Sequence, residues 1–247
     1  MQESFYSNLP RSFTVSNDPI ELRLLQEYGS VFLSRGGVVP PPKIVFRDHA
    51  DVGAFQNSVA TSVETIGGFE IELQTAAMNG LRGAAAEAAA VGYTITPRGS
   101  DSGKRGYDET VGLWKSRIEP ALDHWVSRQR LPADEAKRIR AMPPFDQVAA
   151  VLRLEEDGIW FAKDLTKSIL YSVAPPGTSQ HISMLAIDLN EFGIEPVRTI
   201  LARHGWFQTV FSDLPHFTFL GVPEADLAGL GLRKVTAYDQ VFWLPDI

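Results

Sequence analysis

Two histidines and an aspartate in the last third of the chain carry the side chains that a catalytic metal site requires. His181 and Asp188 lie seven positions apart in an otherwise apolar segment, and His216 follows a turn at Pro215. Two imidazoles and one carboxylate are a ligand set for catalytic zinc, which keeps its fourth position for water. The chain has no cysteine, which excludes thiolate metal sites, disulfides and a cysteine nucleophile.

The local structure around His181 decides whether it can share one ion with Asp188. Residues 182–189 are rich in β-prone apolar side chains and predict a strand. Side chains seven positions apart on a strand point to opposite faces of the sheet. Joint binding of one ion therefore requires that His181 precede the regular strand, in the turn after Gly177, or that a bulge intervene.

The elements that must position these residues are helices first and strands later, which predicts an α+β fold. A helix should begin after Asp18, which can cap it, and end at Gly29. Pro120 should kink or break the helix that contains it. The further helices are expected at about 50–60, 70–91, 107–125, 133–142, 146–156 and 194–204. The strands are expected at 43–46, 93–96, 169–174, 182–189, 206–211, 217–220, 234–238 and 240–244.

Composition describes a globular protein with a sizeable core. The chain has 247 residues, of which 44% are hydrophobic and 21% charged, and its net charge is −7. It shows no basic block for nucleic-acid binding, no membrane-spanning apolar run and no visible signal peptide. We expect residues 1–70 to form an N-terminal helical extension packed on a main domain of residues 71–247. The sequence does not indicate an oligomeric state.

The two metal-ligand segments together resemble the zinc motifs of the peptidase M15 family, the D-alanyl-D-alanine carboxypeptidases and dipeptidases that include VanY-like and VanX-like enzymes. The first motif has a serine two positions before His181, then six residues, then Asp188 with an alanine two positions before it. The second has an acidic residue, Asp213, three positions before His216. The dipeptide Gly205-Trp206 lies between the motifs, as in the family.

This resemblance implies a Hedgehog/DD-peptidase-like fold, in which helices pack on a small, mainly antiparallel sheet that carries a zinc site. It implies that Zn²⁺ is bound by His181, Asp188 and His216. Asp213 takes the position of the general base, and Arg98 that of the arginine that stabilises the transition state. The implied substrate is a peptidoglycan stem peptide, and the implied location is the periplasm or cell envelope.

Further polar side chains are expected to bind the substrate. One of them, Arg105, is also the alternative to Arg98 as the arginine that stabilises the transition state. These side chains are Ser179, Gln180, Tyr171, Gln208 and Arg105.

Two positions depart from the family pattern. Asp213 stands where the family usually has glutamate, and Met184 where it commonly has glycine. The shorter side chain of Asp213 draws its carboxylate back by about 1.5 Å. An alternative is therefore a catalytically weak or inactive zinc-stabilised domain that binds cell-wall peptide or a protein partner. A metal-free interaction protein is the third interpretation and requires the motif match to be accidental.

Overall fold

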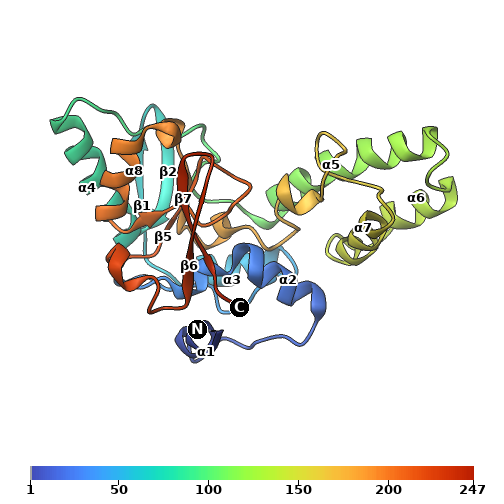
Figure 1. The fold of residues 1–247 in the computed structure, drawn as a ribbon, viewed down its shortest axis with the longest axis horizontal. Coiled ribbons are helices and arrows are strands. Elements are labelled where there is room, and N and C mark those ends of the chain that lie inside the picture. The colour runs from blue at the N-terminus through green and yellow to red at the C-terminus, as the bar shows by residue number, and fades with distance from the viewer. Residues whose placement is uncertain (1) are drawn as a thin grey trace. The chain divides into compact units, whose positions relative to one another are not determined.

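A computed structural model describes residues 2–247, which combine helices with small antiparallel sheets (Figure 1). The predicted α+β class is therefore confirmed. Contacts divide the chain into two compact units. The first comprises the residues up to Ile44 together with Gly53–Arg105 and Gln180–Ile247; the second comprises Val45–Val52 and Gly106–Ser179. The expected extension of residues 1–70 on a main domain of 71–247 stays a prediction.

The first unit contains three antiparallel sheets. One has three strands in the order β3-β5-β4, and the pairs β1-β2 and β6-β7 form the other two. The strands are β1 (Thr61–Ile66), β2 (Phe69–Gln74), β3 (Ala186–Asp188), β4 (Trp206–Phe207), β5 (His216–Phe219), β6 (Leu232–Ala237) and β7 (Gln240–Pro245). The α-helices are α1 (Gln2–Asn8), α2 (Pro19–Tyr28), α4 (Thr75–Ala90) and α8 (Glu195–Arg203). The 3₁₀ helices are η1 (Gly29–Leu33), η3 (Gln180–Ser183), η4 (Asn190–Gly193) and η5 (Glu224–Asp226).

The second unit is helical. It contains α5 (Tyr107–Ser127), α6 (Ala133–Arg140), α7 (Asp146–Glu156) and η2 (Ile169–Tyr171), and α3 (His49–Gln56) is divided between the two units. Its core includes Trp114, whose indole Nε1 donates to Gln147 Oε1 at 3.0 Å, while Gln147 Nε2 donates to the Ile139 carbonyl at 3.1 Å. Pro120 lies inside α5 and does not end it.

The predicted start and end of α2 are confirmed. Asp18 Oδ1 accepts a hydrogen bond from the Ile20 amide at 2.7 Å, and Pro19 is the first helical residue. The Asp18 carboxylate thus pairs with an amide in the first turn of the helix that would otherwise have no partner, the usual function of aspartate before a helix. The helix ends at Tyr28, with Gly29 as its C-cap.

The predicted helix at 70–91 is wrong over its first residues, because Phe69–Gln74 forms strand β2. Gly67 and Gly68 have φ values of 58° and 87°, which suit a two-residue hairpin turn between β1 and β2. Alternation along β2 buries Ile71 and Leu73. Helix α4 begins at Thr75, where buried, mostly alanine side chains start to recur every three or four residues.

Several predicted strands are shorter than expected or absent. Residues 169–174 contain η2 instead of a strand, and residues 43–46 form no strand. Residues 93–96 also form no strand, and the next residue, Pro97, makes an isolated bridge to Leu189. The amide of Ile169 is satisfied by Glu155 Oε1 at 2.7 Å, so this segment needs no partner strand. The strands predicted at 182–189 and 206–211 shorten to β3 and β4.

The N-terminal segment is built into the first unit. Phe5 of α1 is fully buried, and Ser4 Oγ donates to the Gly229 carbonyl at 2.7 Å. Ser30, just after α2, donates from its buried hydroxyl to the Trp243 carbonyl of β7 at 2.9 Å. These contacts hold the end of α2 in place. Within residues 2–247, none of the helices is both long and apolar enough to cross a membrane.

Candidate metal centre

Strands β3 and β5 place Asp188 directly opposite His216. The Asp188 amide donates to the Ser102 carbonyl and the His216 amide to the Asp213 carbonyl, both at 3.1 Å. The two residues therefore form a non-hydrogen-bonded pair, the kind in which facing side chains come closest. His216 Nδ1 lies 3.2 Å from Asp188 Oδ1 as a result.

His181 reaches the same carboxylate from η3, outside the strand. Of the two arrangements that the seven-residue spacing allows, the structure has the one in which His181 precedes the regular strand. Between η3 and β3 the chain turns at Met184, which is fully buried and has a φ of 57°. A left-handed backbone favours glycine, which accounts for the glycine that the M15-like pattern has there. His181 Nε2 lies 3.3 Å from Asp188 Oδ1.

The tautomer of His181 follows from its other ring nitrogen. His181 Nδ1 lies 2.8 Å from the Gly103 carbonyl, which can only accept, so Nδ1 carries the proton. Burial lowers the pKa of His181, so the neutral ring is favoured. Nε2 then presents a lone pair toward Asp188. Within residues 2–247 this buried nitrogen makes no hydrogen bond.

The ring of His216 also faces Asp188 Oδ1. Its Nε2 lies 2.9 Å from Gln180 Oε1. The amide of Gln180 is oriented by its Nε2, which donates to the Tyr28 carbonyl at 2.8 Å, so the oxygen faces His216. An amide oxygen can only accept, and His216 Nε2 must therefore carry the proton. Nδ1 lies 3.2 Å from Asp188 Oδ1 and is the lone-pair nitrogen whenever the ring holds a single proton.

The two oxygens of Asp188 have separate functions. Oδ2 accepts from Arg105 Nη2 at 2.8 Å, and Arg105 Nε donates to the Asp101 carbonyl at 3.0 Å. Oδ1 faces the two imidazoles. The guanidinium of Arg105 stabilises the charged form of this side chain, so Asp188 is a carboxylate in a nearly closed site.

These three side chains fit a divalent cation. One ligand atom from each lies within 4.8 Å of the others. Imidazole lone pairs facing a carboxylate oxygen are repelled by it unless a metal ion or a proton lies between them. Bond lengths of about 2.0–2.2 Å in a tetrahedral zinc site place neighbouring ligand atoms about 3.3–3.6 Å apart. The distances of 3.2 and 3.3 Å to Asp188 Oδ1 are close to that range.

The expected base and the expected arginine lie on loops next to the ligand strands. Asp213 is exposed, with its amide bonded to the Val210 carbonyl and its carbonyl to the His216 amide. The amide of Arg98 donates to the Asp188 carbonyl at 3.1 Å, and its side chain is exposed. Within residues 2–247, neither the carboxylate of Asp213 nor the guanidinium of Arg98 makes a hydrogen bond or ion pair. Both side chains are therefore available to a ligand.

The remaining predicted substrate-binding residues have mixed placements. Ser179 is half-buried at the end of the second unit, and Tyr171 lies in η2 of that unit. The amide of Gln208 donates to the Leu214 carbonyl at 2.6 Å and to Gln240 Oε1 at 2.5 Å, so it supports the turn before β5. The expected contacts of these residues with substrate stay predictions.

The sequence analysis did not identify two groups that hold the ligands. The Gly103 carbonyl fixes His181, and no residue type or spacing signals a backbone contact of this kind. The Thr218 hydroxyl donates to Gln180 Oε1, beside His216. Thr218 was within reach of sequence reasoning, because residues two apart on a strand share a face.

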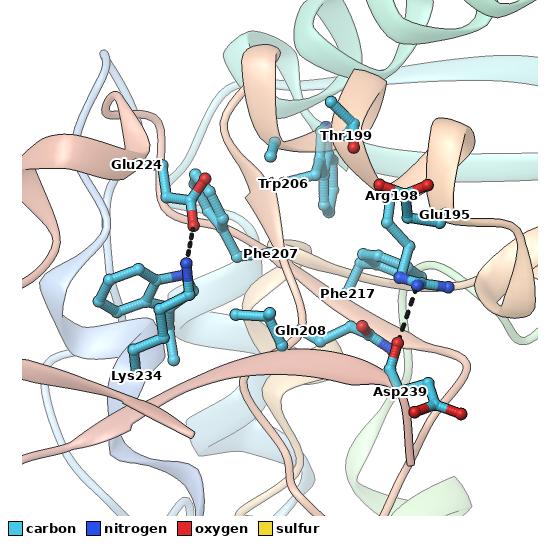
Figure 2. Close-up of a pocket in the computed structure, with 13 residues that line it drawn as sticks. Glu195, Arg198, Thr199, Trp206, Phe207, Gln208, Phe217, Glu224, Lys234 and Asp239 are labelled. Carbon is cyan, nitrogen blue, oxygen red and sulfur yellow. Dashed lines mark hydrogen bonds and ion pairs between the residues drawn. The ribbon is translucent and has the colours of Figure 1, made fainter. Parts of the chain in front are cut away.

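A cavity of about 260 Å³ lies beside α8 and the β6-β7 hairpin and contains no metal ligands (Figure 2). Its lining includes Phe217, which alternates with His216 along β5 and so points to the other face of the strand. Two of its charged side chains have partners: Arg198 donates to the Asp239 carbonyl at 3.1 Å, and Lys234 pairs with Glu224. This cavity therefore lies apart from the cluster of His181, Asp188 and His216.

Comparison with known proteins gives little similarity. No family model matches the chain, and no curated protein matches it. Among solved structures, it is similar to a glutamate-to-alanine mutant of the vancomycin-resistance D,D-pentapeptidase VanY from a VanB-type resistance cassette, in complex with Zn(II). The TM-score is 0.36 with 17% sequence identity, over 67% of this chain and 82% of that chain. The function proposed below therefore rests on the geometry of the site and on the sequence motifs.

Proposed function

We propose that the chain is a zinc peptidase of the M15 type that hydrolyses D-Ala-containing peptidoglycan stem peptides, as a carboxypeptidase or dipeptidase. The observation that carries the proposal is the convergence of His181 Nε2 and His216 Nδ1 on Asp188 Oδ1, at 3.3 and 3.2 Å. Within residues 2–247, the buried Nε2 of His181 has no hydrogen-bond partner, as expected for a metal ligand. The order and spacing of the two motifs support the substrate class, a Hedgehog/DD-peptidase-like fold and a location in the cell envelope.

The residues around the proposed metal centre have different roles in hydrolysis. A bound zinc ion supplies a Lewis acid and a water molecule whose pKa is lowered to about 7. Asp213 takes a proton from the attacking water and returns it to the leaving amine as the peptide C–N bond breaks. Arg98 binds the developing oxyanion or the substrate carboxylate. Arg105 holds Asp188 so that Oδ1 faces the imidazoles.

Hydrolysis of an N-acyl peptide ending in D-Ala-D-Ala tests the proposal. We expect the purified protein to release D-alanine, or the D-Ala-D-Ala dipeptide, from this substrate. Activity should disappear after chelation and return when zinc is added, while the matching L-Ala-L-Ala peptide stays intact. Failure to retain zinc after metal loading, or hydrolysis that persists after chelation, contradicts the proposal.

The two arginines near the centre should behave differently when replaced. Arg98→Gln should lower kcat/KM about 100- to 1,000-fold, because one stabilising donor is lost from the transition state. It should leave zinc affinity unchanged, because the contact of Arg98 with Asp188 is between backbone atoms and is retained in the variant. Arg105→Gln should weaken zinc binding about 10- to 100-fold, because the ligand carboxylate loses its partner.

Steady-state hydrolysis and a zinc titration of both arginine variants check this difference. Exchanged effects would assign the catalytic arginine to position 105, the alternative in the same loop. Full activity of Arg98→Gln would remove that residue from the mechanism.

A second candidate function is a zinc-stabilised binding domain with weak or no catalysis. The observation that favours it is the short side chain of Asp213 where M15-like enzymes usually have glutamate. Such a domain would bind cell-wall peptide or a protein partner through the same site.

A further inference from the structure

The buried amide of Gln180 is engaged on every side. Its oxygen accepts from His216 Nε2 at 2.9 Å and from the Thr218 hydroxyl. Its nitrogen donates to the Tyr28 carbonyl at 2.8 Å. The Thr218 hydroxyl also lies 2.6 Å from that of Thr209, which closes the polar network on the far side of the amide. Gln180 itself is only 4% exposed, so it is shielded from solvent rather than displayed to a substrate.

We propose that Gln180 is a positioning residue that holds His216 in its metal-binding tautomer. This inference rests on the proposed metal function of the site. It differs from the role that the sequence suggested for Gln180, which was contact with substrate. The Tyr28 carbonyl orients the Gln180 amide, because it accepts from the nitrogen and so leaves the oxygen facing His216.

The geometry shows which tautomer this arrangement suppresses. If a neutral His216 carried its proton on Nδ1, it would donate to Asp188 Oδ1, 3.2 Å away. Nδ1 would then have no lone pair with which to bind a metal ion. In that form its Nε2 lone pair would face the lone pairs of Gln180 Oε1 at 2.9 Å. The repulsion between two acceptors disfavours this tautomer. The other tautomer keeps Nδ1 as a ligand.

The arrangement also gives the N-terminal segment a function. Tyr28 is the last residue of α2. The position of this helix is fixed by its N-cap, Asp18, and by the burial of Leu24 and Leu25. The carbonyl of Tyr28 orients Gln180, and Gln180 orients His216. Residues that are remote in sequence from both zinc motifs therefore support the ligand geometry.

The test compares the full-length chain with Gln180→Leu, which removes the acceptor, and Gln180→Glu, which retains it. We expect metal-free Gln180→Leu to show a shift of His216 toward the Nδ1–H tautomer in ¹⁵N NMR of the histidine rings near neutral pH. Zinc affinity, measured by competition with a chelator, should fall about 10- to 100-fold. Gln180→Glu should keep the Nε2–H tautomer. Gln180→Met, also without an acceptor, provides the same comparison if the leucine variant does not fold.

Gln147→Leu is the matched control. Gln147 is equally buried and uses both ends of its amide, but it lies in the second unit. An unchanged His216 tautomer in Gln180→Leu and Gln180→Met would overturn the inference. An equal loss of zinc affinity in Gln147→Leu would also overturn it, because the effect would then be general destabilisation. If the wild-type chain binds no zinc, the proposed function fails, and the tautomer measurement on metal-free protein still decides the role of Gln180.

Discussion

Replacing His181 with alanine is expected to abolish both zinc-dependent stabilisation and hydrolysis of a D-Ala-D-Ala peptide. The substitution removes one of the three proposed ligands, the one that η3 contributes. Zinc at 1,000 times its dissociation constant stabilises the native state by about 4 kcal/mol. For a protein of this size, about 4 kcal/mol corresponds to a rise in Tm of about 8–16 °C. Thermal unfolding with and without zinc should show this rise in the wild type and not in His181→Ala.

His204→Ala is the matched control for this experiment. His204 lies in the same unit, but its Nε2 is paired with Glu87 at 2.8 Å, apart from the three proposed ligands. Its loss should lower stability slightly and leave the zinc-dependent rise in Tm intact. A zinc response that survives in His181→Ala and disappears in His204→Ala would place the metal elsewhere.

Asp213→Asn is expected to lower kcat about 100- to 10,000-fold while zinc affinity is retained. An amide of the same shape cannot accept the proton of the attacking water, and general-base catalysis contributes about this much to rate. Zinc binding should persist because Asp213 is not among the converging ligands. Steady-state kinetics and a zinc titration check the two effects separately. Asp226→Asn, an exposed aspartate on η5, is the control and should leave both unchanged.

Asp213→Glu separates a working enzyme from a weak one. The Asp213 backbone is held on both sides, by the Val210 carbonyl and by the His216 amide. One extra methylene moves the carboxylate by about 1.5 Å, and a misplacement of about 1 Å can cost on the order of 100-fold in rate. We therefore expect a loss of about 100-fold. A large gain in activity would favour the catalytically weak, zinc-stabilised domain.

The clustering of His181, Asp188 and His216 could be predicted from residue types, because the ligands that zinc prefers are few. With no cysteine in the chain, only oxygen and nitrogen ligands remained. The alternation rule also predicted that His181 had to lie outside the strand or beside a bulge, and its position in η3 meets the first condition. The facing of Asp188 and His216 could not be predicted, because cross-strand register depends on the whole sheet.

The contacts that orient the ligands were beyond the sequence for a different reason. Gly103, Tyr28 and Arg105 act through positions that only the folded chain brings together. Backbone carbonyls have no sequence signature, and Gln180 looked equally suited to a substrate contact. Arg105 was expected to bind substrate, which stays a prediction; the structure adds that its guanidinium pairs with Asp188.

Two of the errors in the fold prediction have different physical origins. Residues 69–74 alternate like a strand but run directly into an alanine-rich helix, so the helical period obscured the shorter pattern. Residues 169–174 are β-prone, yet the buried carboxylate of Glu155 satisfies the Ile169 amide locally. Helix ends with capping residues, such as Asp18 before α2, were predicted correctly because the cap is a local interaction.

X-ray data collected at the zinc absorption edge from crystals grown with zinc test the central claim most directly. The account predicts one strong anomalous peak about 2.0–2.2 Å from His181 Nε2, Asp188 Oδ1 and His216 Nδ1. The peak should disappear in crystals of His181→Ala. Zinc bound only at other positions, with His181 Nε2 still unpartnered, would contradict it.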